Sequence, residues 1–173
     1  SVYFTRTTYW VEGKLANING SIKRALVGGM GLGLLILLLS PLYGEGYATI
    51  KALLHGTQSE LLSLGGLDIP QNQIYMILFF IAVILFKPVA SALTIGAGGS
   101  GGIFAPSLFI GGVTGFVFAS SVNFITGSNL LSVSNFTLIG MSGLMSGILH
   151  APLTAIFLIA EITSGYTLFV PLM

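Results

Sequence analysis

The sequence has very few charged residues. Only 6% of its 173 residues are Asp, Glu, Lys or Arg, whereas ordinary soluble domains carry about 25%. After Lys87, the only charged side chain is that of Glu161. Hydrophobic residues make up 54% of the chain, so the composition excludes an ordinary soluble domain and indicates a membrane protein. We expect the second half to be embedded in lipid.

Other absences narrow the possible functions. The chain has no cysteine, which excludes disulfides and thiolate metal sites, and we expect neither a metal nor a cofactor. A net charge of +1, without a basic run, gives no reason to expect a nucleic-acid partner. The first residues lack the charged and apolar regions of a signal peptide. Because the sequence starts without Met and stops within an apolar run, we expect 1–173 to be one partial transmembrane domain of a larger polypeptide.

The basic residues gather at the start of the chain. Four of the six Lys and Arg residues lie in the first 24 positions: Arg6, Lys14, Lys23 and Arg24. Residues 2–10 predict the end of a helix, and the polar stretch 12–24, with its Gly and Asn residues, predicts a loop. The positive-inside rule places this loop of segment 1–24 on the cytoplasmic side.

Residues 25–95 predict membrane helices. Ala25–Leu39 is apolar but shorter than the about 20 residues that a spanning helix needs. Tyr47–His55 predicts a short helix that is interfacial or partly inserted, and the polar stretch 56–73 predicts an extracytoplasmic loop.

A second apolar segment, 74–95, predicts a spanning helix. It is interrupted by Lys87 and Pro88. We expect the Lys87 side chain to extend toward a membrane interface.

The most informative stretch is 96–112, where small residues precede a long apolar run with Pro106 near its start. Glycine lets the backbone approach a ligand closely, and proline costs nothing in the first helical turn, where its missing N–H would have no partner. The free N–H groups and the positive end of the helix dipole favour an anion. We predict an anion-site loop and helix start. The alternative is a packing hinge between two membrane helices.

Residues 113–173 predict the remaining membrane helices. The apolar run that starts at Ile103 reaches Ile125, whereas Phe136–Leu149 and Ala151–Ile162 are each too short to span a bilayer. Such interrupted segments are typical of broken helices that line a cavity or pack within protein. The predicted fold class is an all-α membrane protein with tilted, broken and re-entrant helices.

Three motifs in this region resemble a known family. Gly102-Ile103-Phe104-Ala105-Pro106 is similar to the G-x-F-x-P element of CLC chloride channels and chloride–proton antiporters. Gly140–Gly143 and the segment from Ala151 to Thr163 resemble later elements of that family, in the same order. The resemblance covers about the last eighty residues and points to a bacterial-type member.

The resemblance implies that this chain forms most of the second inverted-repeat half of a CLC-type fold. It further implies that the backbone N–H groups of Ile103 and Phe104 bind chloride, which is the transported ion. Their supporting neighbours in the motif are Gly101, Gly102, Ala105 and Pro106.

The resemblance also carries expectations about partners. It implies a homodimer, with residues 151–173 facing the second subunit, in a multi-pass protein of the bacterial cytoplasmic (inner) membrane. The family's serine loop, its gating and proton-path glutamates and its final tyrosine do not occur in this chain. Passive and proton-coupled transport therefore stay open, as does the selectivity among anions.

Two other functions remain as alternatives. The chain could be a membrane-embedded assembly or dimerisation segment that does not transport on its own. The Gly140–Gly143 motif also has the form of a rhomboid-protease serine motif, but Ser142 and His150 are eight residues apart, or about 12 Å along a helix. That distance is too long for a nucleophile and its base. We expect Glu161 near a membrane edge and His150 in a cytoplasmic-side loop.

Overall fold

The computed structural model describes residues 2–56 and 72–163, and all regular elements in these ranges are helical. In chain order they are α1 (Val2–Ala16), α2 (Ser21–Leu38), η1 (Ser40–Leu42), α3 (Tyr47–His55), α5 (Gln73–Gly96), α6 (Phe104–Thr126), α7 (Val133–Leu149) and α8 (Pro152–Thr163). The predicted all-α fold is confirmed. Most of the expected loop at 56–73 and the last apolar segment lie outside the described residues.

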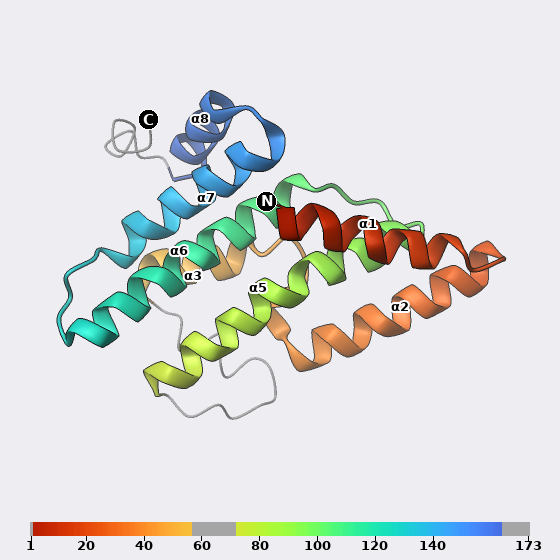
Figure 1. Cartoon of the computed structure of the whole chain (residues 1–173), viewed down its shortest axis with the longest axis horizontal. Coiled ribbons are helices and arrows are strands. Elements are labelled where there is room, and N and C mark those ends of the chain that lie inside the picture. Colours follow the sequence, from red (N-terminus) through yellow and green to blue (C-terminus); the bar gives the residue numbers. More distant parts are fainter. Residues whose placement is uncertain (1, 57–71, 164–173) are drawn as a thin grey trace.

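The helices pack in a sequence of neighbours with α5 near the middle (Figure 1). α5 contacts α1, α2 and α6, α6 packs against α7, and α7 against α8. By length and composition, α2, α5 and α6 are able to cross a membrane. The predictions that α3 is short and that neither segment after residue 133 can span alone are confirmed by the helix bounds.

The prediction that residues 12–24 form a loop is wrong. α1 continues to Ala16, and only residues 17–20 separate it from α2. The buried residues of α1 follow a helical stripe: Phe4, Thr8, Val11 and Leu15. Val11 and Leu15 pack against Ala92 of α5, so tertiary burial extends the helix through a segment whose glycine and charges favour a loop.

α5 runs without a break through Lys87 and Pro88, which confirms the prediction of one long helix over this segment. Proline lacks an N–H and so leaves a carbonyl of the preceding turn without its helical partner. Near this turn the Tyr3 hydroxyl of α1 donates to the Leu85 carbonyl at 3.0 Å and the Ser91 hydroxyl donates to the Lys87 carbonyl at 3.0 Å. The first bond joins α1 to α5, and neither involves the Ile84 carbonyl that Pro88 leaves without its helical partner.

α6 and α7 approach each other through glycine. A Cβ atom at Gly111 would overlap the backbone of Gly140, and one at Gly115 would overlap the carbonyl of Phe136. Small residues allow this backbone contact, which compensates for the weak hydrophobic drive between helices in lipid. The contact holds the α6–α7 hairpin together and fixes the direction of α6.

We therefore expect Gly115→Ala to destabilise the protein by about 1–3 kcal/mol, because the new methyl group must push the two helices apart. The matched control is Gly143→Ala on α7, where a Cβ atom has open space around it. The control should be neutral or slightly stabilising, since alanine is the better helix former. Chemical denaturation in detergent measures both changes, and equal stabilities for the two variants would contradict the close contact.

Candidate anion site

A tight turn joins α5 to α6. The amide of Ala97 donates to Leu93 and that of Gly98 to Ile95, both at 3.0 Å, and the Gly99 amide donates to Thr94 at 2.9 Å. Gly98 has a φ of +97°, a conformation that glycine adopts without steric cost. The turn closes α5 and sends the chain back into the protein toward the start of α6.

The first turn of α6 leaves its amides free. Ile103 precedes the helix with no side-chain cap, and no acidic residue lies in the first turn. The first helical bond at this end runs from the Ser107 amide to the Ile103 carbonyl at 3.1 Å. In the described part of the chain, no acceptor receives the N–H groups of residues 101–105. This is the arrangement in which a helix N-terminus can bind an anion.

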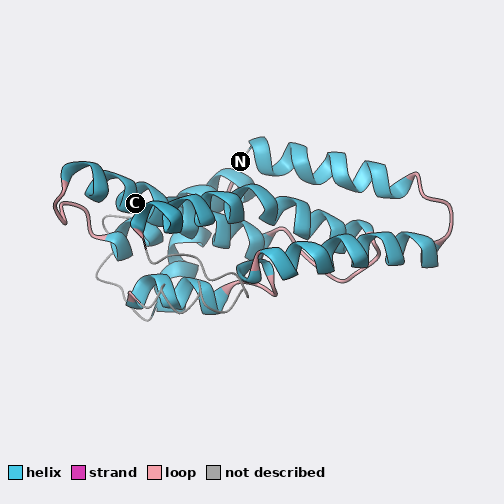
Figure 2. Ribbon diagram, turned by 90° about the horizontal axis from the view of Figure 1, so that it is seen from below, coloured by secondary structure: helices cyan, strands magenta, loops and turns pink. Residues whose placement is uncertain are grey.

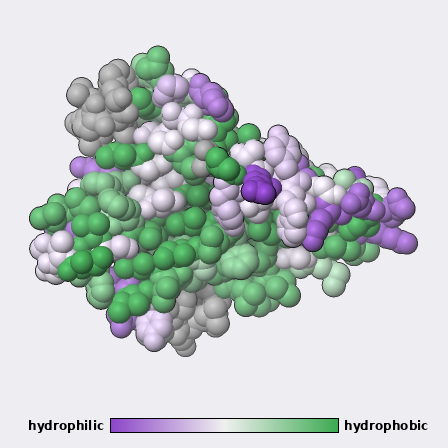
Figure 3. Space-filling model, in the orientation of Figure 1, coloured by the Kyte–Doolittle hydropathy of each residue, from purple (hydrophilic) through white to green (hydrophobic). Residues whose placement is uncertain are grey.

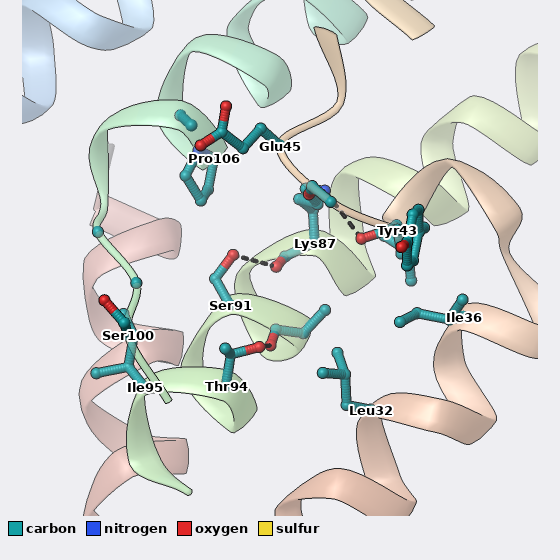
Figure 4. A pocket seen from close by; sticks show the side chains of 16 residues that line it. Leu32, Ile36, Tyr43, Glu45, Lys87, Ser91, Thr94, Ile95, Ser100 and Pro106 are labelled. Carbon is teal, nitrogen blue, oxygen red and sulfur yellow. Dashed lines mark hydrogen bonds between the residues drawn. The ribbon is translucent and has the colours of Figure 1, made fainter. Parts of the chain in front are cut away.

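A cavity of about 350 Å³ lies beside this loop. One side is formed by residues 100–102 with Ala105 and Pro106, and another by α5, from which Lys87, Ser91 and Thr94 face the space (Figure 4). Leu32 and Ile36 of α2 lie across from α5. The cavity thus joins the predicted loop to a polar stripe of α5 with helical spacing.

Lys87 does not reach a membrane interface, so that expectation is wrong. Its side chain is 2% exposed and donates to the carbonyls of Leu42 at 3.0 Å and Gly44 at 2.9 Å. The ammonium also lies 4.6 Å from the centre of the Phe109 ring, within the range of a cation–π contact. A buried charge needs such partners, and these partners tie the segment after η1 to both α5 and α6.

The segment from Gly44 to Gly46 is held on both sides of Glu45. The Gly44 carbonyl accepts from Lys87, and Gly46 lies so close to the Phe109 ring that a Cβ atom would overlap it. Both glycines have positive φ values, 62° and 86°. Glu45 is exposed, and its carboxylate lies beside Pro106 at the edge of the cavity (Figure 4).

The structure brings four of the six predicted site residues to the cavity: Gly101, Gly102, Ala105 and Pro106. Ile103 and Phe104, whose amides are the predicted anion donors, are not among the lining residues, and the Ile103 side chain is 42% exposed. Their role is assigned to backbone N–H groups, so the outward direction of the Ile103 side chain does not bear on it. The assignment stays a prediction.

Sequence reasoning missed the parts of the cavity that come from Lys87, Glu45 and the hydroxyls of α5. The signal for Lys87 was present, because an ionisable residue within an apolar membrane segment indicates a function or a specific partner. Its partners could not be identified, since Leu42 and Gly44 are more than forty positions away in the sequence.

Ser142 and His150 do not form a catalytic pair. Ser142 lies in α7 and His150 directly follows the last residue of that helix, which is continuous between them. The Ser142 hydroxyl donates to the Ile139 carbonyl at 2.9 Å. The two side chains are thus separated along one helix, as the sequence spacing predicts.

Comparison with known proteins agrees with the membrane fold. A family model described as voltage gated chloride channel matches residues 1–173. The chain is 29% identical over 151 residues to the H(+)/Cl(-) exchange transporter ClcA of Vibrio campbellii, covering 87% of this chain and 28% of that protein. It is 33% identical over 147 residues to ClcA of Yersinia pestis, covering 85% of this chain and 27% of that protein. The chain therefore spans less than a third of these relatives.

The geometry around Lys87 predicts that this side chain holds the 42–46 segment in place. Lys87→Met keeps the apolar stem but removes two charge-assisted hydrogen bonds, each worth about 1.5–3 kcal/mol. Loss of one such bond alone would favour local opening roughly 10–100-fold, so we expect the backbone amides of residues 43–47 to exchange with deuterium at least roughly 10 times faster. Hydrogen exchange with mass spectrometry measures this change.

The control for this experiment is Lys51→Met on α3, an exposed lysine, which should leave the exchange of the same amides unchanged. Unaltered exchange in Lys87→Met would show that the two Lys87 hydrogen bonds do not stabilise the 42–46 segment.

Proposed function

The chain belongs to the voltage-gated chloride channel family, and from this we propose that its protein moves chloride or a similar small anion across a membrane. In this proposal the loop at 100–103 and the start of α6 form one wall of the anion pathway. The observation that carries it is the run of free amides at residues 101–105 beside a cavity that also holds a buried ammonium.

At this site, N–H donors of the protein would replace the water molecules that hydrate the anion. An anion that enters the protein loses water, and its free energy rises unless other donors take the place of that water. Backbone N–H groups at a helix start supply such donors without reorganisation, and the helix dipole adds a partial positive charge of about half a unit. The absence of an acidic residue in the first turn of α6 leaves these donors free of a competing carboxylate. No bond is made or broken, so we do not propose an enzyme.

Lys87 supports the same site electrostatically. Its charge stays inside the protein because two carbonyls and an aromatic ring surround it. A fixed cation that lines the cavity lowers the energy of an anion there, because charges interact strongly where water is scarce. Ser91 and Thr94 do not add donors in their present orientation, since each hydroxyl donates to a carbonyl of α5.

Two relatives of the chain are H(+)/Cl(-) exchange transporters, which favours exchange of chloride for protons over passive flow, and we propose exchange as the mode to test first. We also propose a multi-pass location in a bacterial cytoplasmic membrane and a homodimer in which α8 faces the second subunit. Leu153 on α8 is 59% exposed, which supports a covered position for this helix in the complete protein.

A second candidate is that this segment serves assembly and that transport requires the rest of the polypeptide. The observation that favours it is the exposure of α2, in which Gly28 is the one buried residue. Separate and joint expression of this segment and the remaining polypeptide distinguishes the two. Chloride flux from this segment alone would exclude a purely assembling role.

The predicted donors can be tested by removing a single N–H group. Ile103→Pro deletes one amide donor, and the φ of −81° at this position is close to the proline value. A hydrogen bond to a charged partner is worth about 1.5–3 kcal/mol, so chloride affinity should fall roughly 10–100-fold. Calorimetric titration of the purified protein and chloride efflux from proteoliposomes measure the effect.

Ile103→Val is the matched control, because it changes the side chain and keeps the amide. It should bind and transport chloride like the parent protein. If Ile103→Pro folds and shows unchanged affinity and flux, the assignment of the anion site to this loop is wrong.

The position of Glu45 predicts a separate effect. An exposed carboxylate at the edge of the cavity repels an anion inside it, and solvent screening limits this repulsion to about 0.2–1 kcal/mol. Glu45→Gln removes the repulsion and should raise chloride affinity by up to about fivefold at neutral pH. The same titration measures it, and a lower affinity would indicate that the carboxylate helps to hold the site open.

A further inference from the structure

Another cavity lies toward the far end of α6, away from the loop that precedes this helix. Both ribbon views place the connection from α6 to α7 at one extremity of the molecule (Figures 1 and 2). α5 begins on the same side, where a hydrophilic patch interrupts a largely hydrophobic surface (Figures 1 and 3). The cavity has a volume of about 410 Å³ and is lined by residues of α3, α5, α6 and α7. We call it the far cavity.

The far cavity is lined by a buried hydroxyl that has no partner. Ser120 of α6 is 4% exposed, and its hydroxyl takes part in no hydrogen bond within residues 2–56 and 72–163. Thr49 also lacks a partner but lines another cavity. Four other buried helical hydroxyls each donate to a carbonyl three or four positions earlier: those of Thr8, Ser107, Thr137 and Ser142. Because native proteins seldom leave a buried polar group unpaired, the Ser120 hydroxyl indicates a ligand in the cavity.

Two helices begin at the far cavity. Residues of both first turns line it: Gln73 and Met76 of α5, and Val133 and Ser134 of α7. Within the described part of the chain, the amides of residues 73–75 and 133–134 donate to no acceptor. Neither first turn holds an acidic residue. The positive ends of two helix dipoles therefore meet at the cavity that Ser120 lines.

The rest of the polar wall is neutral. Asn123 and Asn129 contribute carboxamides, and none of the described lining residues is charged. The Asn123 amide donates to the Leu131 carbonyl and its oxygen accepts from the Leu131 amide, both at 2.9 Å, so one N–H of this carboxamide stays available. Gly56, which ends α3, brings the carbonyl end of that helix to the same space. The cavity thus offers N–H and O–H donors, together with acceptors that suit water.

From these observations we propose that the far cavity binds a small inorganic anion, such as chloride, that keeps part of its water. The Ser120 hydroxyl donates to the anion, and the free amides at the starts of α5 and α7 stabilise its charge. The retained hydration follows from size. A water molecule takes up about 30 Å³ in the liquid, so a cavity of about 410 Å³ holds an anion together with several water molecules.

The sign of the charge follows from the donors. Hard cations are bound by carboxylates and carbonyl oxygens, and no carboxylate lines the described wall of the far cavity. A neutral molecule would gain nothing from two positive helix ends. An anion is the occupant that uses both the helix starts and the unpaired hydroxyl.

This site is separate from the one proposed at the start of α6. Ser120 lies sixteen positions beyond Phe104 on the same helix, or about 24 Å along its axis. The two sites can therefore be occupied and tested independently, and the far cavity does not rest on the proposed transport.

The test uses crystals of the purified complete protein, soaked at graded concentrations of bromide, whose anomalous scattering distinguishes it from water. We expect an anomalous peak within hydrogen-bond distance of the Ser120 Oγ. Ser120→Ala should raise the bromide concentration for half occupancy at least roughly tenfold, the usual effect of one hydrogen bond to a charged group. Ser142→Ala is the matched control, because its hydroxyl is already bonded to the Ile139 carbonyl, and it should leave the peak unchanged.

Ser134→Asp tests the site in a second way. A carboxylate in the first turn stabilises α7, so the fold is kept, but it repels an anion in the cavity and the peak should disappear. This variant decides alone if Ser120→Ala fails to fold. Water without bromide in the far cavity, an unchanged half-occupancy concentration in Ser120→Ala, or a full peak in Ser134→Asp would each overturn the proposal.

Ile103→Pro separates this proposal from the proposed function. It removes a donor at the start of α6 and should leave the peak beside Ser120 in place. A peak beside Ser120 without one at the α6 start would count against the transport site and support the far cavity. Loss of the Ser120 peak in Ile103→Pro would show that the far cavity is not an independent site.

Discussion

A single ammonium group joins the elements that surround the cavity. Lys87 belongs to α5, its two acceptors belong to the end of η1 and the turn after it, and the ring beneath it belongs to α6. Without these partners a buried cation would cost several kcal/mol, so the charge is stable only while all three elements stay together. The position of Glu45 and the shape of the space beside the α6 start both depend on this contact.

The sequence was sufficient for features that depend on local chemistry. The start of α6 could be predicted because glycine and proline have fixed backbone preferences, and α3 could be predicted because glycines bound it. The segment 12–24 could not, since its helical state depends on Val11 and Leu15 packing against Ala92. That contact joins parts of the chain that are distant in sequence, and propensity does not report it.

The candidate site shows the same division. The free amides of residues 101–105 could be predicted from their pattern, because they follow from glycine, proline and the absence of a capping side chain; that they bind an anion stays a prediction. The opposite wall of the cavity could not, because Lys87 and Glu45 reach it through the fold. The sequence suggested that Lys87 extends to an interface. The structure shows that carbonyls inside the protein replace the water that this cation would otherwise need.

The glycine contact between α6 and α7 has a consequence for motion. Where two backbones are in direct contact, there is no side chain between them that could change rotamer. Sliding of α6 along α7 therefore cannot be accommodated by side-chain rearrangement. The pair must move as one rigid body, with the start of α6 carried along by α7. A rearrangement that opens or closes the cavity is thus confined to its other borders, where Lys87 and the turn around Glu45 lie.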